Sequence, residues 1–408
     1  MKNNITFLKR KLSLLLILLV FSVTYSQDFT NYNSDDGLIE GMIHSITKDH
    51  SDNFWFGSFA DVDNDFNFGL ASYDGTVFTI YSTDDGLADN KVFEIITDTN
   101  GNLWVGTDNG LSKFDGEIWT TFTVEDGLSG NVVVSLFQDS NDNLWFGCYN
   151  DATGGIGITK FDGTNWTTYN NIGYRSITQS NNGDIWVGGE LGVHKFDGTN
   201  WVTYDVTDGL STNNVFAIAF DNDENLWVGN NDDVGIDRFD GTTWTHFTTD
   251  DGLPHNRARA IIKDSENNMW FGTDWGISKY DGNTFTNYNY TDGLIYDQVR
   301  SLYLDNNDLW IGTFFGVSVL DLNSLGIEDH INLENIKIYP NPTSDKLFFE
   351  NAENIIINKI IISNALGQKL LLYNSIENID ISNLTNGIYY ISVEDNNGNI
   401  STFNVIKQ

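Results

Sequence analysis

Short apolar runs alternate with polar residues along most of the chain, and each run ends at a cluster of turn residues. In the stretch from Asp85 to Phe122 four such runs follow one another: Val92–Thr97, Leu103–Gly106, Leu111–Phe114 and Ile118–Phe122. Alternation at a period of two predicts half-buried β-strands. Gly, Asn and Asp fill the turns between them, where positive φ angles or side-chain-to-backbone hydrogen bonds are needed. The stretch therefore predicts a four-stranded antiparallel sheet.

The same pattern recurs seven times, marked by the motif N-L-W-V-G or a close variant. Successive tryptophans of this motif are 49, 41, 41, 41, 43 and 40 residues apart, and they are Trp55, Trp104, Trp145, Trp186, Trp227, Trp270 and Trp310. Repeats of this length and strand content are typical of the blades of a β-propeller. We predict an all-β protein with a seven-bladed β-propeller over residues 27–321.

The outer strand of the last blade is missing from its expected place. A motif (W/F)-T-x-(Y/F) follows the third strand in blades one to six, but it does not follow Val317–Asp321 in blade seven. The same motif stands at the start of the propeller, at residues 29–32. We predict that this N-terminal strand completes blade seven, which would remove two sheet edges and close the ring.

The repeat tryptophans are interpreted as core residues that pack between blades, because a tryptophan side chain buries about 150–250 Å². A cation recurs two residues before a turn aspartate in five blades, and we interpret this series as structural: Lys113, Lys160, Lys195, Arg238 and Lys279. Function is therefore sought where the repeats depart from their own consensus.

The repeat pattern stops at Leu322, and a segment of different composition begins after a linker at 322–336. Residues 337–408 contain two of the three prolines and no tryptophan. Six short alternating runs predict a small Ig-like β-sandwich: 346–350, 359–363, 369–373, 379–381, 387–394 and 400–406.

Residues 1–26 have the pattern of a secretory signal peptide. A basic start is followed by the apolar run Leu12–Phe21, which is too short to span a bilayer, and then by small residues before Gln27. We expect an exported chain without a transmembrane segment. The single cysteine, Cys148, excludes an intramolecular disulfide.

The formal net charge of −36 changes the range of expected partners. It excludes nucleic acid as a ligand and disfavours strongly anionic ligands, unless a local basic cluster exists. We expect the protein to be a monomer with no cofactor.

Two family resemblances follow from these motifs. The D-G-L, N-L-W-V-G-T and F-D-G elements of residues 27–321 resemble the two-component regulator propeller family, whose members include periplasmic ligand-binding domains of sensor proteins. Y-P-N-P, N-A-L-G-Q and L-T-N-G-I-Y-Y-I-S-V in residues 337–408 resemble the sorting domain of the type IX (Por) secretion system of Bacteroidetes. This second resemblance implies contact with the type IX machinery and release from the cell or attachment to its surface. No kinase sequence follows the propeller, so kinase signalling is not carried over.

In a four-stranded blade, the loop that enters the first strand and the loop that joins strands two and three lie on one rim, which we call the loop rim. Residues that depart from the consensus gather in these loops. The candidate ligand-binding residues are Trp275, Phe314, Phe315, Arg257, His255, Tyr296, Tyr149 and Arg175. Aromatics beside charged groups can stack on an apolar face of a ligand while polar neighbours fix its orientation. Packing of these aromatics against neighbouring loops is the alternative interpretation.

The evidence for a metal or a catalytic site is weak. Asp61, Asp63 and Asp65 are spaced like the start of a Ca²⁺ loop, but Phe66 and Ser72 replace the usual Gly and Glu, so they are only a weak calcium candidate. The turns that begin at Asp98, Asp139 and Asp221 need only local hydrogen bonds and are interpreted as structural. The six histidines lack metal-ligand spacing, and no nucleophile or phosphate-loop motif is present.

The sequence thus predicts a secreted or surface-attached, non-catalytic propeller that binds a glycan or a peptide. The first alternative is a structural or adhesive surface protein. The second is a polysaccharide lyase or hydrolase, because a pair of catalytic carboxylates is not excluded.

Overall fold

A computed structural model describes residues 29–59, 69–150, 155–170, 174–324, 336–351, 357–364, 368–373, 379–395 and 400–408. The predicted signal peptide and the calcium candidates Asp61, Asp63 and Asp65 lie outside these ranges. Of the predicted linker, residues 322–324 form a single 3₁₀ turn, η5 (Leu322–Ser324), and residue 336 begins a strand.

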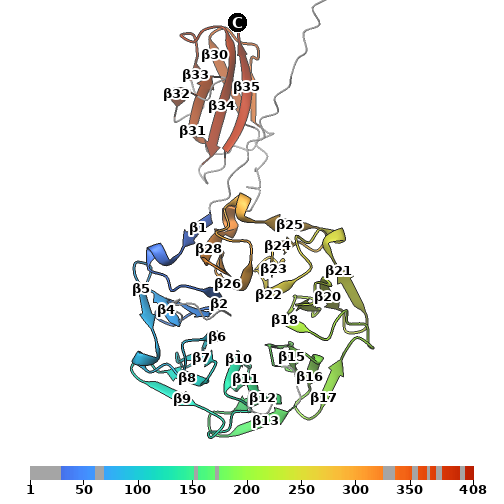
Figure 1. Ribbon diagram of the computed structural model, residues 1–408. Coiled ribbons are helices and arrows are strands. Elements are labelled where there is room, and N and C mark those ends of the chain that lie inside the picture. The colour runs from blue at the N-terminus through green and yellow to red at the C-terminus, as the bar shows by residue number, and fades with distance from the viewer. Residues whose placement is uncertain are drawn as a thin grey trace, which may run out of the picture.

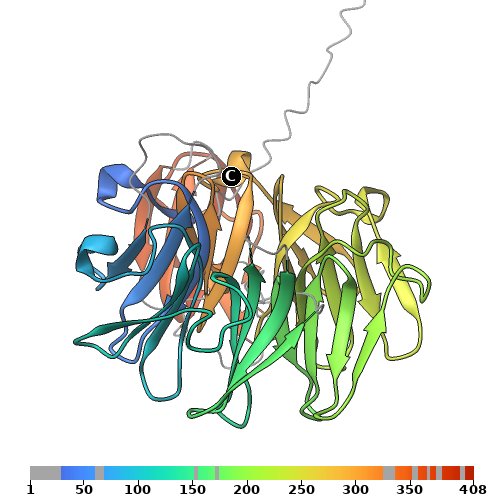
Figure 2. The same cartoon turned by 60° about the horizontal axis from the view of Figure 1, so that its bottom comes forward.

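Seven four-stranded antiparallel sheets form a ring, which confirms the predicted propeller (Figure 1). In each blade the first strand lies innermost and the last lies at the outer edge, and Figure 2 shows the strands running between two rims. Blades one to three consist of β2 (Met42–Lys48), β3 (Phe54–Phe59), β4 (Leu70–Tyr73) and β5 (Phe78–Tyr81); β6 (Val92–Thr97), β7 (Leu103–Thr107), β8 (Gly110–Phe114) and β9 (Trp119–Phe122); and β10 (Val132–Gln138), β11 (Leu144–Asn150), β12 (Gly155–Phe161) and β13 (Trp166–Asn170).

Blades four to six repeat this order. They consist of β14 (Ser176–Gln179), β15 (Ile185–Gly189), β16 (Gly192–Phe196) and β17 (Trp201–Tyr204); β18 (Val215–Phe220), β19 (Leu226–Asn230), β20 (Ile236–Phe239) and β21 (Trp244–Phe247); and β22 (Ala258–Lys263), β23 (Met269–Thr273), β24 (Gly276–Tyr280) and β25 (Phe285–Tyr288). Single 3₁₀ turns open four of the loops that enter a first strand: η1 (Ser34–Asp36), η2 (Thr83–Asp85), η3 (Thr249–Asp251) and η4 (Tyr290–Asp292).

Blade seven combines both ends of the propeller. β26 (Val299–Asp305), β27 (Asp308–Thr313) and β28 (Gly316–Asp321) are joined by β1 (Phe29–Tyr32), which pairs antiparallel with β28 from Phe29 opposite Leu320 to Tyr32 opposite Val317. The Tyr32 ring stacks on Trp310 at a centroid distance of 6.1 Å. β1 therefore covers the edge that β28 would otherwise expose.

The repeat tryptophans lie in the core between blades. Trp55 of blade one packs with Leu87, Val92 and Val105 of blade two, and Trp310 packs with Ile39 and Ile43 of blade one. The motif glycine permits this close approach: a Cβ on Gly229 would come within 2.5 Å of the Ala258 carbonyl oxygen in the next blade. Each of the recurring cations lies over the indole of its own blade, as Lys279 does over Trp270 at 5.7 Å.

The turns between strands one and two and the turns between strands three and four lie on the rim opposite the loop rim. We call this the turn rim. In five blades an aspartate carboxylate there accepts a hydrogen bond from the indole N–H of the repeat tryptophan six residues later, at 2.8–2.9 Å; these residues are Asp49, Asp98, Asp139, Asp221 and Asp264. Each also accepts backbone N–H groups of its own turn. The turns are thus held by the local hydrogen bonds that the sequence predicts.

The C-terminal domain consists of two small sheets. β29 (Ile336–Tyr339), β30 (Lys346–Asn351) and β33 (Ile379–Asp380) form one, and β32 (Lys369–Tyr373), β31 (Ile357–Asn364), β34 (Gly387–Asp395) and β35 (Ile400–Lys407) form the other. Leu347 and Ile379 of the first sheet share a core with Ile360, Ile391 and Val405 of the second. This is the sandwich arrangement that the six alternating runs predict, with β29 as an additional strand.

Candidate functional site

The first strands of the blades surround a cavity of about 330 Å³ at the centre of the ring. One residue per blade, 10 or 11 positions before the repeat tryptophan, lines it in register; we call this set the channel ring. Its members are His44, Phe93, Val134, Arg175, Phe216, Arg259 and Arg300.

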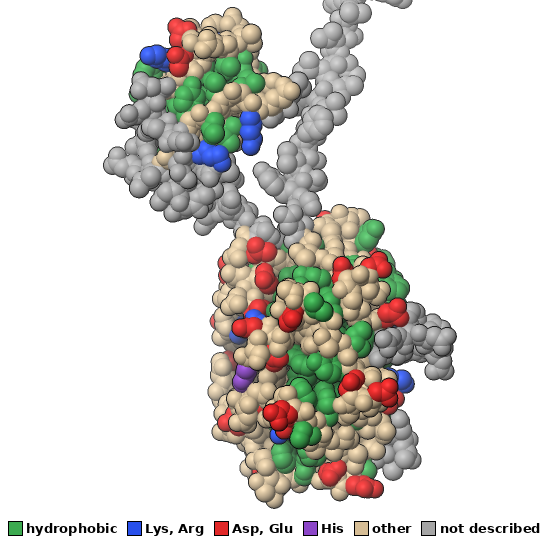
Figure 3. Space-filling model, turned by 90° about the vertical axis from the view of Figure 1, so that its left-hand side faces the viewer, with side chains coloured by type: hydrophobic (Ala, Val, Ile, Leu, Met, Phe, Trp, Pro, Cys, Tyr) green, Lys and Arg blue, Asp and Glu red, His purple; other side chains and the backbone are tan. Residues whose placement is uncertain are grey.

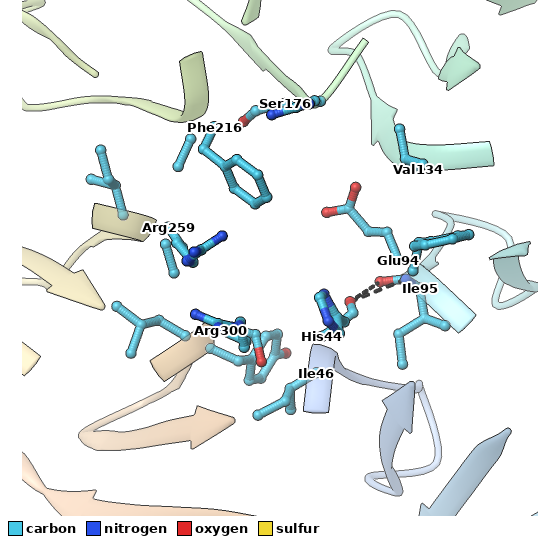
Figure 4. A pocket seen from close by; sticks show the side chains of 18 of the residues that line it. His44, Ile46, Glu94, Ile95, Val134, Ser176, Phe216, Arg259 and Arg300 are labelled. Atoms are coloured by element: carbon cyan, nitrogen blue, oxygen red, sulfur yellow. Dashed lines mark hydrogen bonds between the residues drawn. The ribbon is translucent and has the colours of Figure 1, made fainter. Parts of the chain in front are cut away.

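A β-bulge explains why these residues face the channel. In six blades the pairing of the first two strands shifts by one residue at this position, as between Ile43 and Ser45 or between Ala258 and Ala260. A bulge inserts one unpaired residue and redirects side chains. Figure 4 shows the side chains of His44, Phe216, Arg259 and Arg300 around the cavity, each from a different blade.

Three arginines converge on a single carboxylate at the loop-rim end of the channel. Asp274 accepts hydrogen bonds from Arg259 Nε at 3.2 Å and from Arg300 Nη1 at 2.9 Å, and Arg257 Nη1 lies 3.5 Å from its other oxygen. The arginines hold the pKa of Asp274 below its ordinary value, against the effect of burial. Asp232 is a further carboxylate nearby, since hydrogen bonds from Thr212 and Asn214 and then the charges of Arg175 and Arg257 lower its pKa. Asp274 and Asp232 together offset two of the three guanidinium charges, so the group keeps a local excess of positive charge.

A fourth arginine lies on the other side of the Phe216 ring. The guanidinium carbons of Arg175 and Arg259 lie 5.1 and 5.2 Å from the ring centroid, which are cation–π distances. Arg175 also binds Glu190 at 2.5 Å and Asn214 at 2.9 Å. Phe216 thus holds two arginines apart while both stay at the cavity.

Two further titratable groups face the cavity. The His44 ring stacks on Phe59 at 3.9 Å, and burial, followed by the charges of Arg300 and Arg259, lowers the pKa of His44 to about 3. Glu94 follows the ring residue Phe93, and its Oε2 atom accepts a hydrogen bond from the backbone N–H of Leu136 in the next blade at 2.7 Å. Burial raises the pKa of Glu94 to about 8, so its carboxyl is largely protonated at neutral pH.

Glu94 replaces a serine that makes the same contact in other blades. Ser45 accepts the backbone N–H of Ile95 at 3.1 Å, and Ser176 accepts that of Ile218 at 3.2 Å. The longer glutamate keeps this link between blades and also brings a carboxyl group to the cavity (Figure 4).

The candidate residues at the loop rim form three separate groups. Trp275, directly after Asp274, is 63% exposed, and its ring centroid lies 5.1 Å from that of His255. Arg257 is one of the three arginines around Asp274, which we call the arginine group. Phe314, Phe315 and Tyr296 contact one another at centroid distances of 4.8–6.1 Å, and Phe315 is 53% exposed. Tyr149 stacks on Tyr174 at 6.1 Å, beside Arg175.

Five residues of this region are not among the candidates predicted from the sequence: Arg259, Arg300, Glu94, Phe216 and Asp274. The available signal was their fixed distance from the repeat tryptophan and the scarcity of arginine, since four of the six arginines of the chain belong to this region. The local basic cluster that would admit an anionic ligand is therefore present. Elsewhere acidic side chains outnumber basic ones, as the side of the propeller in Figure 3 shows.

No group of histidine, cysteine and carboxylate side chains suited to a metal ion occurs among the described residues. Within the same ranges, no helix is long and apolar enough to cross a membrane.

The fold and this cavity define a propeller with a polar central cavity. Comparison with known families identifies the kind of repeat from which it is built. Residues 86–109, 127–150, 209–232 and 252–275 match the two component regulator propeller model, and residues 337–407 match the secretion system C-terminal sorting domain. The chain is thus built of two component regulator propeller repeats followed by a Por-type sorting domain. That domain marks it for type IX secretion to the cell surface or the medium.

No curated protein matches the sequence. Among solved structures, the extracellular domain of a putative hybrid two component system from B. thetaiotaomicron is 18% identical at a TM-score of 0.60, over 94% of this chain and 57% of that one. PorZ, a surface component of the type IX secretion system of Porphyromonas gingivalis, is 17% identical at 0.54, over 90% and 59%. A virginiamycin B lyase from Staphylococcus aureus is 16% identical at 0.58, over 72% and 99%. This chain spans less than two thirds of the length of the first two structures. At these sequence identities the similarity shows a shared fold alone.

Proposed function

We propose that this exported propeller is a non-catalytic binding protein that holds a glycan or a peptide at its loop rim. The observation that carries the proposal is the position of Trp275. This exposed indole directly follows Asp274, the carboxylate on which three arginines of the cavity mouth converge. A flat apolar surface beside a polar pocket is the arrangement that fixes both the plane and the orientation of a ligand.

A thermal-shift screen of the full chain tests this proposal. The panel contains neutral oligosaccharides, acidic oligosaccharides and peptides, because a ligand that binds only the folded state raises Tm by mass action. A ligand is expected whose stabilisation is lost in Trp275→Ala or Phe315→Ala. Ile118→Ala is the matched control, because Ile118 is 63% exposed and lies in a strand-three-to-four turn on the turn rim.

Two outcomes would contradict the proposal. Absence of any shift across the panel with well-folded protein would favour the structural or adhesive alternative. Turnover of a bound polysaccharide, seen as new reducing ends or as unsaturated sugar products, would favour the lyase or hydrolase alternative.

A further inference from the structure

The arginines at the channel mouth suggest which ligands the loop rim selects. We propose that the mouth of the central channel is a carboxylate site for an acidic oligosaccharide, in which Arg259 and Arg300 bind the carboxylate of a uronic acid residue. This inference rests on the proposed function and narrows its ligand from glycans and peptides to one class.

The charge distribution gives the first argument. The chain as a whole has a formal net charge of −36, yet Arg257, Arg259 and Arg300 share one carboxylate within 3.5 Å. Packing three guanidinium groups together costs electrostatic energy. Burial lowers the pKa of Arg259 most, and the charge of Arg300 lowers it further. A further carboxylate, supplied by a ligand, would relieve this repulsion.

The hydrogen-bonding capacity of the group gives the second argument. Three guanidinium groups offer many more N–H donors than one carboxylate can accept. Arg257 Nε and His44 Nε2 are buried polar atoms without a hydrogen-bond partner in the described structure. Arginine presents its donors as a planar fork that matches a carboxylate, so the mouth offers directed contacts as well as charge.

The surroundings favour a sugar acid over a peptide. A cavity of about 330 Å³ has room for one or two monosaccharide units, and the exposed indole of Trp275, the residue after Asp274, provides a face for the next sugar of the chain. Phe216, held between Arg175 and Arg259, adds an apolar surface inside the cavity. Charged groups around flat rings suit a ligand with carboxylates on one edge and C–H groups on its faces.

Isothermal titration of the full chain with oligogalacturonate of about three units and with its methyl ester tests the charge directly. The ester differs from the acid only by the loss of the carboxylate charges. The acid is expected to bind, and the ester to bind more weakly by about tenfold or more, which corresponds to the loss of one hydrogen bond between charged groups. Binding of the acid should also weaken at high salt.

Variants then locate the site. Arg259→Gln and Arg300→Gln should each weaken binding of the acid by about tenfold or more. Arg259→Lys, which keeps the charge but loses the fork, should give a smaller loss. Lys91→Gln is the control, because it removes one positive charge beside Asp108 at the loop rim of blade two, outside the cavity lining. Tm of each variant is measured to show that it is folded.

The possible failures are distinguishable. The carboxylate site is wrong if the acid and the ester bind equally. It is also wrong if both arginine variants keep full affinity while Trp275→Ala loses it. In either case the proposed binding at the loop rim stands. If an acidic peptide binds in an arginine-dependent way and no uronate oligosaccharide does, the ligand class is wrong. If none of these acidic ligands binds but another member of the thermal-shift panel does, the carboxylate site is wrong and the proposed function stands. If no member of that panel binds either, both fail.

Discussion

The two rims of the propeller are built from the same seven repeats, yet they differ in how far their side chains vary. On the turn rim, five blades use the same aspartate-to-indole hydrogen bond at almost the same distance. At the loop-rim end of the channel, the seven equivalent ring positions hold arginine, histidine, aliphatic and aromatic residues. Side chains that repeat from blade to blade are those that the ring needs to fold. Positions that vary between blades are where a ligand can be recognised.

The two rims exist only in a closed ring, so the most severe test of this comparison is to open the ring. Deletion of residues 27–33 removes β1 and with it the stacking of Tyr32 on Trp310. The free energy of unfolding should fall by about 5 kcal/mol or more, because the edge of β28 and the apolar surface beneath β1 become exposed. Thermal unfolding measures this, with Thr30→Ala, an exposed position on the same strand, as the control. An unchanged Tm would show that β1 does not close the ring.

The repeat tryptophans should show the scaffold role most clearly among single substitutions. Trp270 is fully buried, and its indole N–H donates to Asp264 at 2.8 Å. Trp270→Ala should destabilise the protein by about 3–5 kcal/mol, because it leaves a large cavity between two blades. Denaturant unfolding measures the loss. A loss below about 1 kcal/mol would contradict the assignment of Trp270 to the core.

The aspartate turns allow a comparison within the turn rim itself. Asp264 accepts the Trp270 indole N–H and the backbone N–H groups of Glu266 and Asn268, whereas Ser180 stands in the equivalent place of blade four and the Trp186 indole has no partner in the described structure. Asp264→Ala should cost about 2–3 kcal/mol, since it leaves buried donors unsatisfied. Ser180→Ala should cost less than about 1 kcal/mol. Equal losses in denaturant unfolding would mean that the indole bond adds nothing.

The scaffold was predictable from the sequence because its elements repeat. The spacing of the seven tryptophans predicted the blades, and the unmatched F-T-N-Y motif indicated the strand that now pairs with β28. Departures from the consensus also led to Trp275 and Phe315, both of which the structure leaves exposed.

The channel ring was missed for a physical reason. Ile43 and Ser45 are buried on either side of His44, and a bulge in the pairing with the second strand leaves His44 facing the channel. The alternation of residues in one strand does not mark such a bulge, nor does it show that this face of the strand borders a channel. The Asp274 group joins residues from blades six and seven, and only the closed ring brings them together. Periodicity within one repeat does not contain that information.

Glu94 at the channel should make the stability of the protein depend on pH around neutrality. Burial raises the pKa of Glu94 to about 8, above its ordinary value, so the folded state holds a proton that the unfolded state releases. The resulting stabilisation is complete below the unfolded pKa and is lost as pH rises through about 8. His44, whose pKa is lowered to about 3, acts in the opposite direction and destabilises as pH falls below its ordinary value.

Unfolding of the wild type and of Glu94→Gln should therefore be compared between pH 5 and pH 9. Glutamine keeps an acceptor for the Leu136 N–H but does not titrate, so the difference in stability between the two proteins should move in favour of the variant as pH rises. The effect at neutral pH should be smaller than that of Asp264→Ala, because Glu94 also faces the channel. A difference that is constant with pH would mean that Glu94 is ionised in the folded protein.

Trp275→Ala should give the smallest change in stability and thus the sharpest contrast between the two faces of the molecule. Trp275 and Trp270 are five residues apart in one blade, but the first is 63% exposed and the second is fully buried. Removing Trp275 should change the free energy of unfolding by no more than about 0.5 kcal/mol, because little apolar surface is transferred to water and no cavity forms. The same variant should lose ligand binding, since the indole is an exposed apolar face on the residue that follows Asp274. If Trp275→Ala instead unfolds the protein, the indole belongs to the scaffold and the division between the two rims is wrong.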